Sequence, residues 1–232
     1  MKTGIIGAME SEVQGLLAQL NEERTVEKAT MVFHQGNIHG RQVVVVKCGV
    51  GKVNAALCAQ ILIDEFAVTQ VINTGAAGSL NDELNIGDVV ISRDVVHHDF
   101  DTSALGDRKG EIFAGRIGFE ADPQLIEKAC HAVVNAASGI NYRCGRICSG
   151  DQFVSSQAVK QAIIREFSGD CAEMEGAAIG QCCWLNHVPF VIIRAISDKA
   201  DEEGSMSFEQ FVKLAAANST AIVLDMLKQM ES

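Results

Sequence analysis

The stretch TGIIGAMESEVQGLLAQL, residues 3–20, sets the pattern for the whole chain. Residues 3–7 form a short apolar run of the kind that makes a buried strand. From Val13 to Leu20 the apolar residues recur at helical spacing, which predicts an amphipathic helix beginning near Glu10. A strand followed directly by a helix is the repeating unit of α/β folds, so we expect an α/β protein.

The same alternation continues outward from this stretch to the end of the chain. We expect further strands near residues 31–35, 41–47, 70–74, 88–96, 143–149, 171–174 and 190–197. Helices are expected near residues 52–65, 122–137, 156–167, 175–186 and 208–230. No repeat, charge block or Pro-rich linker divides the chain, so residues 1–232 are expected to form one domain.

Local signals refine three of these boundaries. Asn37 and Gly40 supply turn residues for a hairpin between the second and third strands. Asp122, followed by a proline, predicts the N-cap of the helix near residues 122–137. Ser207, with Gln210 three residues later, predicts a capping box at the start of the last helix.

Composition limits the class of protein and its partners. The 232 residues are 47% hydrophobic and have a formal net charge of -11, which disfavours nucleic acid and anionic membranes as partners. No segment reads as a targeting signal or is apolar enough to span a membrane. The eight cysteines form no Cys-x-x-Cys pair, and most are expected to be small core residues. We therefore expect a cytoplasmic protein in a reducing compartment.

Chemically active side chains are concentrated after the predicted strands. In open α/β sheets ligands bind beyond the carboxyl ends of strands. Five segments follow predicted strands directly: GAMESE, NTGAAGS, SGDQFV, EMEGAA and AISDKAD. A single carboxylate there is explained by a helix N-terminus. Seven carboxylates in these segments together indicate acid–base chemistry at one edge of the sheet. They are Glu10, Glu12, Asp151, Glu173, Glu175, Asp198 and Asp201.

Two cofactor interpretations are disfavoured. The glycine segments lack the G-x-G-x-x-G fingerprint of dinucleotide-binding folds. His97, His98, Asp99 and Asp101 have the side chains of a metal cluster, but their spacing mixes strand and loop. We therefore favour a solvated acidic loop and expect no metal site.

The ordered motifs GIIGAMESEV, CGVGKVNAA, NTGAAGSL, GDVVIS, SGDQFV, EMEGAAI, RAISDKAD and MSFEQF closely resemble the bacterial 5′-methylthioadenosine/S-adenosylhomocysteine nucleosidases. These enzymes belong to the nucleoside phosphorylase superfamily. The resemblance implies a three-layer α/β/α sandwich around a mixed central sheet, a homodimer, and adenine nucleosides as small-molecule substrates. The implied reaction hydrolyses the N-glycosidic bond to adenine and a thioribose, without a cofactor.

Matched motif by motif, the resemblance also implies roles for individual residues. Glu12 would activate water, Glu175 would bind the ribose hydroxyls, and Asp198, oriented by Ser197, would act at adenine N7. Arg194 would help to orient the water and Glu175. Phe153 would stack on the base and the Val154 backbone would read its edge. The other implied pocket residues are Met9, Val50, Ala77, Gly78, Glu173, Met174 and Phe208.

The chemistry of the residues agrees with these roles. Cleavage at C1′ needs an acid on the side of the base and a base on the side of the water. A buried Asp198 would keep a proton available for the leaving adenine, whereas Glu12 must be ionised. Phe153 and the methionines, taken singly, are as well explained as core residues.

Two positions depart from the commoner family pattern. Ala76 stands where a serine is frequent, and Leu105 replaces a frequent phenylalanine. Leu105, Ile112 and Phe113 look stranded on the polar loop 100–113, and we expect them to reach a partner subunit, with folding back onto the same subunit as the alternative.

Three other functions stay open. One is a nucleoside phosphorylase, which Glu10 and Glu12 would oppose by repelling phosphate. The second is a hydrolase of another 5′-substituted nucleoside, such as a futalosine derivative. The third is a nucleoside-binding protein without turnover.

Overall fold

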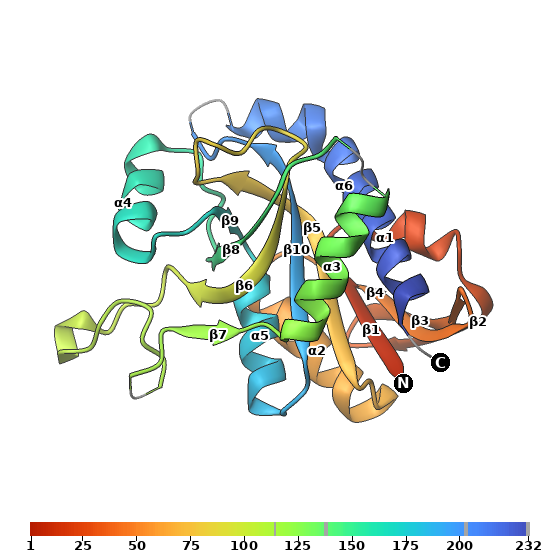
Figure 1. Ribbon diagram of the computed structural model, residues 1–232. Helices are drawn as coiled ribbons and strands as arrows, with labels where there is room; N and C mark the ends of the chain where they lie inside the picture. Colours follow the sequence, from red (N-terminus) through yellow and green to blue (C-terminus); the bar gives the residue numbers. More distant parts are fainter. Residues whose placement is uncertain (114, 137–138, 202–203, 231–232) are drawn as a thin grey trace.

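The computed structural model describes residues 1–113, 115–136, 139–201 and 204–230, and strands and helices alternate along it (Figure 1). The strands are β1 (Lys2–Gly7), β2 (Asn21–Lys28), β3 (Met31–Ile38), β4 (Arg41–Lys47), β5 (Gln70–Ser79), β6 (Val89–His97), β7 (Gly118–Glu120), β8 (Tyr142–Ser149), β9 (Cys171–Glu173) and β10 (Phe190–Asp198). The α-helices are α1 (Glu10–Leu17), α2 (Lys52–Phe66), α3 (Pro123–Ala136), α4 (Gln157–Phe167), α5 (Gly176–Leu185) and α6 (Gly204–Gln229). None of these helices is long and apolar enough to cross a membrane.

All ten strands belong to one mixed sheet, in the order β10-β6-β8-β9-β5-β1-β4-β3-β2, with β7 paired to β6. Strand β1 runs parallel to both β4 and β5. Strand β10 pairs with β6 and also with β5. As a result, five strands close into a ring of paired neighbours, in the order β5, β10, β6, β8 and β9. The ring brings together strands that are far apart in the sequence.

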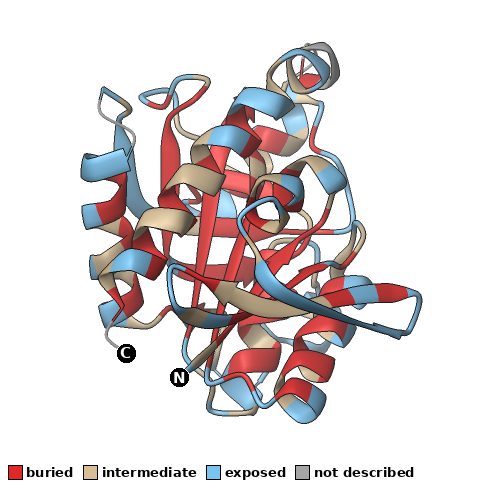
Figure 2. Cartoon of the chain, turned by 90° about the vertical axis from the view of Figure 1, so that its right-hand side faces the viewer, coloured by how far each residue is buried: buried red, intermediate tan, exposed pale blue. Residues whose placement is uncertain are grey.

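Helices cover both faces of the sheet, as the three-layer prediction requires. In β4, Val43 and Val45 pack into the core shared with α1, α3 and α6, whereas Val44 and Val46 pack into the core shared with α2 and α5. This alternation is the two-residue period of a strand buried on both faces. Figure 2 shows the buried strands inside and the exposed surfaces of the helices outside. The predicted α/β sandwich around a mixed sheet is confirmed.

Several boundaries differ from the prediction. Strand β5 continues through the NTGAAGS segment to Ser79, because it pairs with β10 and then with β9. The expectation that NTGAAGS lies beyond its strand is therefore wrong, although it still reaches the same edge of the sheet. Strand β10 ends at Asp198, within one residue of its predicted end, and so includes the start of the AISDKAD segment.

The hairpin of β3 and β4 is confirmed, with Gly40 in its turn as predicted, but Asn37 is not a turn residue. His39 and Gly40, with φ of 50° and 77°, form the turn. Asn37 lies within β3, and its side chain donates a 2.7 Å hydrogen bond to Glu22.

Of the two predicted helix caps, one is confirmed and one is wrong. Oδ1 of Asp122 accepts hydrogen bonds of 3.0 Å from the backbone N–H groups of Gln124 and Leu125. Ser207 does not cap α6, because the helix begins at Gly204, whose N–H already closes a turn onto the carbonyl of Asp201. The predicted end of α3 near Ala137 lies outside the described residues.

Six of the eight cysteines are buried, as expected for core residues. The exceptions are Cys130, which is half-buried, and Cys144, which is exposed.

Candidate active site

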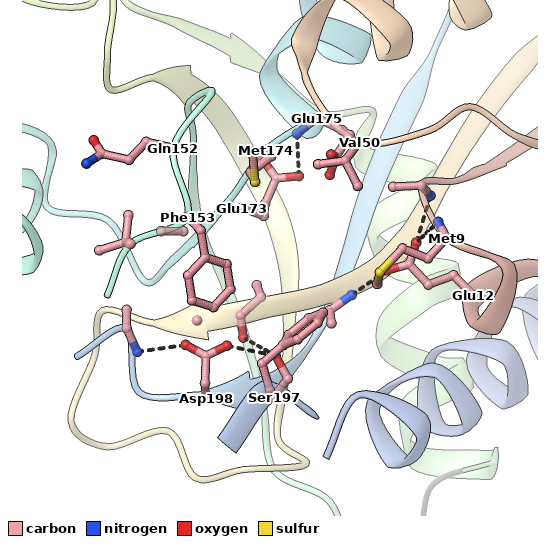
Figure 3. A pocket seen from close by; sticks show the side chains of 18 residues that line it. Met9, Glu12, Val50, Gln152, Phe153, Glu173, Met174, Glu175, Ser197 and Asp198 are labelled. Atoms are coloured by element: carbon pink, nitrogen blue, oxygen red, sulfur yellow. Dashed lines mark hydrogen bonds between the residues drawn. The ribbon is translucent and has the colours of Figure 1, made fainter. Parts of the chain in front are cut away.

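A pocket of about 230 Å³ lies at the carboxyl ends of β1, β4, β8, β9 and β10 and beside β5 (Figure 3). Every residue to which the family resemblance assigns a role, except Arg194, lines it. These lining residues are Met9, Glu12, Val50, Ala77, Gly78, Phe153, Val154, Glu173, Met174, Glu175, Ser197, Asp198 and Phe208. The sequence argument did not select Ala8, Gln152, Ala172 and Ala200 of the same lining.

Glu12 occupies the first turn of α1, and its carboxylate turns back toward the chain that enters the helix (Figure 3). Oε2 accepts hydrogen bonds from the backbone N–H groups of Ala8 at 2.7 Å and Met9 at 2.9 Å, and Oε1 accepts one from Ala76 at 3.1 Å. Burial raises the pKa of Glu12, while the charge of Arg194 and these N–H groups oppose the rise. Glu12 is therefore a fixed, partly desolvated carboxylate suited to accept a proton.

Glu175 directly precedes α5 and is also buried. Its Oε1 accepts a 2.9 Å hydrogen bond from the N–H of Gly51, whose φ of 102° favours glycine. Burial, with the neighbouring charge of Glu173, raises the pKa of Glu175 to about 7, against the opposing charge of Arg194. Its carboxylate consequently titrates close to neutral pH.

Arg194 lies behind the pocket and is 1% exposed. Its NH2 group donates to the carboxylate of Glu173 and, at 2.6 Å, to Oδ1 of Asn73, and it lies 3.8 Å from Oε2 of Glu175. Burial alone would lower the pKa of Arg194, but the surrounding carboxylates of Glu173, Glu175 and Glu12 outweigh it and raise the pKa. Arg194 therefore remains the positive charge among three buried carboxylates.

Glu173 lines the pocket, but its oxygens are already used by protein donors. They accept hydrogen bonds from Arg194, the hydroxyl of Ser149, and the N–H groups of Glu175 and Gly176. Glu173 thus caps the start of α5 and holds Arg194. Sequence reasoning missed Ser149 and Asn73, although both lie inside quoted motifs, because their contacts depend on strand pairing.

Asp198 ends β10 on the other side of the pocket from Glu12 (Figure 3). Its Oδ2 accepts a 2.9 Å hydrogen bond from Ser197 Oγ, and its Oδ1 accepts one of 2.9 Å from the N–H of Ala200. Burial raises the pKa of Asp198, and the charge of Asp201 adds to the rise. The two hydrogen bonds and the charge of Lys160 oppose it. Asp198 is accordingly placed to hold a proton in the pocket.

Apolar side chains form the remaining wall. The rings of Phe153 and Phe208 meet edge to face, with centroids 5.7 Å apart. Figure 3 shows Phe153 and Asp198 toward one side of the pocket and Met9 and Glu12 toward the other. An aromatic face next to a protonatable carboxyl group suits a planar, nitrogen-containing ring.

Three of the seven predicted carboxylates do not line the pocket. Glu10 forms an exposed ion pair with Lys47 at 2.9 Å. Asp151 accepts a 2.8 Å hydrogen bond from the N–H of Lys52 at the start of α2. Asp201 lies on the turn after β10. The expectation that all seven line one site is wrong for these three: Glu10 and Asp151 contact Lys47 and Lys52 instead, and Asp201 lies beyond the end of β10.

The histidine–aspartate segment is dispersed. His97 is buried in β6, and burial lowers its pKa to about 4. The carboxylate of Asp99 accepts hydrogen bonds from Lys52 and from the N–H of Asp151, and Asp101 accepts one from the N–H of Ser103. Within the residues that the structure describes, no group of three or more His, Cys, Asp or Glu side chains is arranged to hold a metal ion.

Comparison with known proteins identifies the family of this chain. The sequence model of the phosphorylase superfamily matches residues 2–228. The 5′-methylthioadenosine/S-adenosylhomocysteine nucleosidase of Exiguobacterium sp. is 42% identical over 232 residues, covering 100% of this chain and 99% of that protein. The chain belongs to this nucleosidase family. It is therefore an enzyme, a hydrolase of N-glycosidic bonds.

Other nucleosidases and solved structures agree with this assignment. The nucleosidase of Tolumonas auensis is 42% identical over 231 residues, covering 99% of this chain and 100% of that protein. The nucleosidase of Neisseria meningitidis, solved in complex with methylthio-immucillin-A, has a TM-score of 0.95 and 40% identity, with 99% of each chain covered. Futalosine hydrolase of Helicobacter pylori is also similar, with a TM-score of 0.94, 34% identity, and coverage of 99% of this chain and 98% of that chain.

Proposed function

We propose that this enzyme hydrolyses the N-glycosidic bond of 5′-methylthioadenosine and S-adenosylhomocysteine, releasing adenine and the corresponding thioribose. One observation chiefly supports the proposal: buried Glu12 and buried Asp198 line separate sides of one pocket, with the Phe153 ring toward the side of Asp198. This is the placement that acid–base cleavage of a nucleoside requires. The names of the similar nucleosidases support the choice of substrate.

In this mechanism the electron pair of the bond between C1′ and adenine N9 leaves with the base. Asp198 supplies a proton at N7, so that adenine departs as a neutral molecule. Glu12 removes a proton from the water whose oxygen bonds to C1′. Ionised Glu175 binds the ribose hydroxyls and stabilises the positive charge that develops on the sugar.

The remaining residues hold this arrangement. Ser197 orients Asp198 through its hydroxyl, and Arg194 fixes Glu173 while its charge acts on Glu175 and Glu12. Met9, Val50, Met174 and Phe208 form the apolar wall for the sugar and its 5′-thio group. Phe153 stacks on the base, and the backbone of Val154 reads its edge.

The position of Glu12 argues for hydrolysis over phosphorolysis. The N–H groups of Ala8, Met9 and Ala76 could bind a phosphate, but they donate to the Glu12 carboxylate. Phosphate would also meet that negative charge. Glu10, which we expected to contribute to this repulsion, lies outside the pocket in its pair with Lys47.

The direct test is to incubate the enzyme with 5′-methylthioadenosine, with and without phosphate, and to measure adenine release. We expect equal rates under both conditions. Dependence on phosphate would indicate a phosphorylase, and binding without release would indicate a nucleoside-binding protein. Because futalosine hydrolase is 34% identical, futalosine is included as a competing substrate. Preferential cleavage of futalosine would replace the proposed substrate.

We also propose a homodimer and a single domain in a reducing compartment such as the cytoplasm. The match of the superfamily over residues 2–228 supports one domain, and the eight free thiols support the compartment. For the dimer, Val53, Leu57 and Leu185 form an exposed apolar area on α2 and α5, which we call the α2–α5 face. A contiguous apolar area of this kind suits burial against a second copy.

The loop 100–113 presents fewer apolar residues to a partner subunit than expected. Ile112 packs against the core of its own chain, and the Phe113 ring lies 5.7 Å from Trp184. Of the three apolar residues, Leu105 is the most exposed, at 83% against 38% for Phe113. Leu105 therefore remains the candidate for reaching the partner's pocket.

A further inference from the structure

Helix α4 carries a buried lysine, Lys160, whose charge acts on Asp198. Lys160 is 4% exposed, although lysine is rarely buried without a partner. Its Nζ donates a 2.9 Å hydrogen bond to the backbone carbonyl of Lys199 and lies 3.6 Å from Oδ1 of Asp82, whose side chain is 95% exposed. The ammonium group is thus held mainly by the segment that follows β10.

That segment fixes Asp198. Ala200 is buried and has a φ of 53°, which is unfavourable for a residue with a side chain. In this conformation its N–H donates the 2.9 Å hydrogen bond to Oδ1 of Asp198. Ala200 also packs with Val154 and Ile163, so the turn lies between α4 and the pocket. The bond from Lys160 to Lys199 supports a strained turn at the point where it contacts the acid.

Among the described residues, the charges of Lys160 and Asp201 act on the Asp198 carboxyl. Asp201 lies on the same turn and acts in the opposite sense. Nζ of Lys199 is directed to the carbonyl of Leu84. Gly78 of β5 and Gly204 of α6 also lie against the Asp198 carboxyl, and neither carries a charge. Loss of the Lys160 charge would therefore favour the protonated form of Asp198.

Resting on the proposed function, we propose that Lys160 is a positioning residue: its buried ammonium group holds the Lys199–Ala200 turn, and through it sets the place of the Asp198 carboxyl against the leaving base. Lys160 does not line the pocket and does not touch substrate. Its effect is exerted through the turn and through its charge.

The test compares Lys160→Met with Lys160→Arg, which keeps the charge, and with Arg165→Met, which removes an exposed charge from the same helix. The measurement is the pH dependence of kcat and KM on 5′-methylthioadenosine. For Lys160→Met we expect kcat to fall about 10- to 100-fold with little change in KM. We also expect the high-pH limb of kcat, where Asp198 loses its proton, to move up by about half a pH unit or more.

Lys160→Arg should restore the wild-type limb and most of kcat, and Arg165→Met should match the wild type. If Lys160→Met does not fold, Lys160→Gln tests the same loss of charge. A folded neutral variant with wild-type kcat and an unmoved limb would overturn the proposal. Equal losses in the Met and Arg variants with an unmoved limb would also overturn it, by showing a packing role. An inactive wild type would defeat the proposed function itself.

Discussion

The backbone N–H of Ala76 donates a 3.1 Å hydrogen bond to Oε1 of Glu12, joining β5 to the start of α1. Because the backbone supplies this bond, the carboxylate is held whether position 76 is alanine or serine. The departure from the commoner family pattern at Ala76 therefore leaves the proposed base in place.

The close contact between Glu12 and β5 gives the first prediction. A Cβ atom added at Gly75 would lie 2.6 Å from Oε1 of Glu12, so Gly75→Ala must displace the carboxylate. We expect kcat on 5′-methylthioadenosine to fall by roughly 100-fold. Ala76→Ser, one residue away, is the matched control and should keep kcat near the wild-type value. A Gly75→Ala enzyme with normal kcat would show that the position of Glu12 is not critical.

The acid and the base should each be indispensable. Glu12→Gln and Asp198→Asn keep size and hydrogen bonding but remove proton transfer, so each should lower kcat by roughly 10²- to 10⁴-fold. Steady-state kinetics and thermal unfolding would be measured together. Glu10→Gln, on the same helix and paired with Lys47, is the control and should be fully active. Near-normal kcat in either active-site variant would remove that residue from the mechanism.

Burial of Glu175 should cost stability in a defined pH range. Its folded-state pKa is raised from 4.5 to about 7, so it is protonated in the folded protein over a range where the unfolded chain is ionised. The resulting loss of free energy of unfolding is absent below about pH 4.5, grows as pH rises toward 7, and then levels off at up to about 3 kcal/mol. Urea unfolding of the wild type and of Glu175→Gln at pH 5, 6, 7 and 8 would measure it.

The variant should gain stability relative to the wild type as pH rises through that window. A difference between the two proteins that is constant from pH 5 to 8 would contradict the raised pKa.

Sequence patterns predicted the interior of the fold better than its edges. The valines of β4 are buried on both faces, so their continuous apolar run identified the strand directly. Strand β2, NEERTVEK, is exposed at all eight positions and pairs only with β3. With no face to bury, it has no alternation to detect. The extension of β5 through glycine and alanine was likewise hidden, because pairing with β10 and β9 rather than local propensity maintains it.

The site was predictable where motif and burial coincide. Glu12, Glu175 and Asp198 follow or end strands that meet at one edge, so their convergence could be inferred from the sequence. The contacts of Asn73 and Ser149 could not, because each depends on which strands are neighbours in the sheet. Glu10 was wrongly predicted to line the site, because its position in the motif does not determine the direction of its side chain.

Assembly should be linked to activity. Leu57 of the α2–α5 face and Leu105 of the loop are exposed, and a buried aspartate at either position would be costly in a dimer. Analytical ultracentrifugation of Leu57→Asp and Leu105→Asp should show weaker self-association by about tenfold or more, with reduced kcat/KM. Val32→Asp, an exposed valine on β3, is the control. Monomeric variants with unimpaired kcat/KM would show that the partner contributes nothing to the pocket.

The most direct test of the central claim follows the oxygen atom at C1′. The wild-type enzyme would be incubated with 5′-methylthioadenosine in H₂¹⁸O containing phosphate, and the mass of the sugar product would be measured by mass spectrometry. The acid–base arrangement of Glu12 and Asp198 predicts free methylthioribose with one ¹⁸O atom and an equal amount of adenine. A sugar 1-phosphate as product, or bound nucleoside without any adenine release, would contradict hydrolysis at this site.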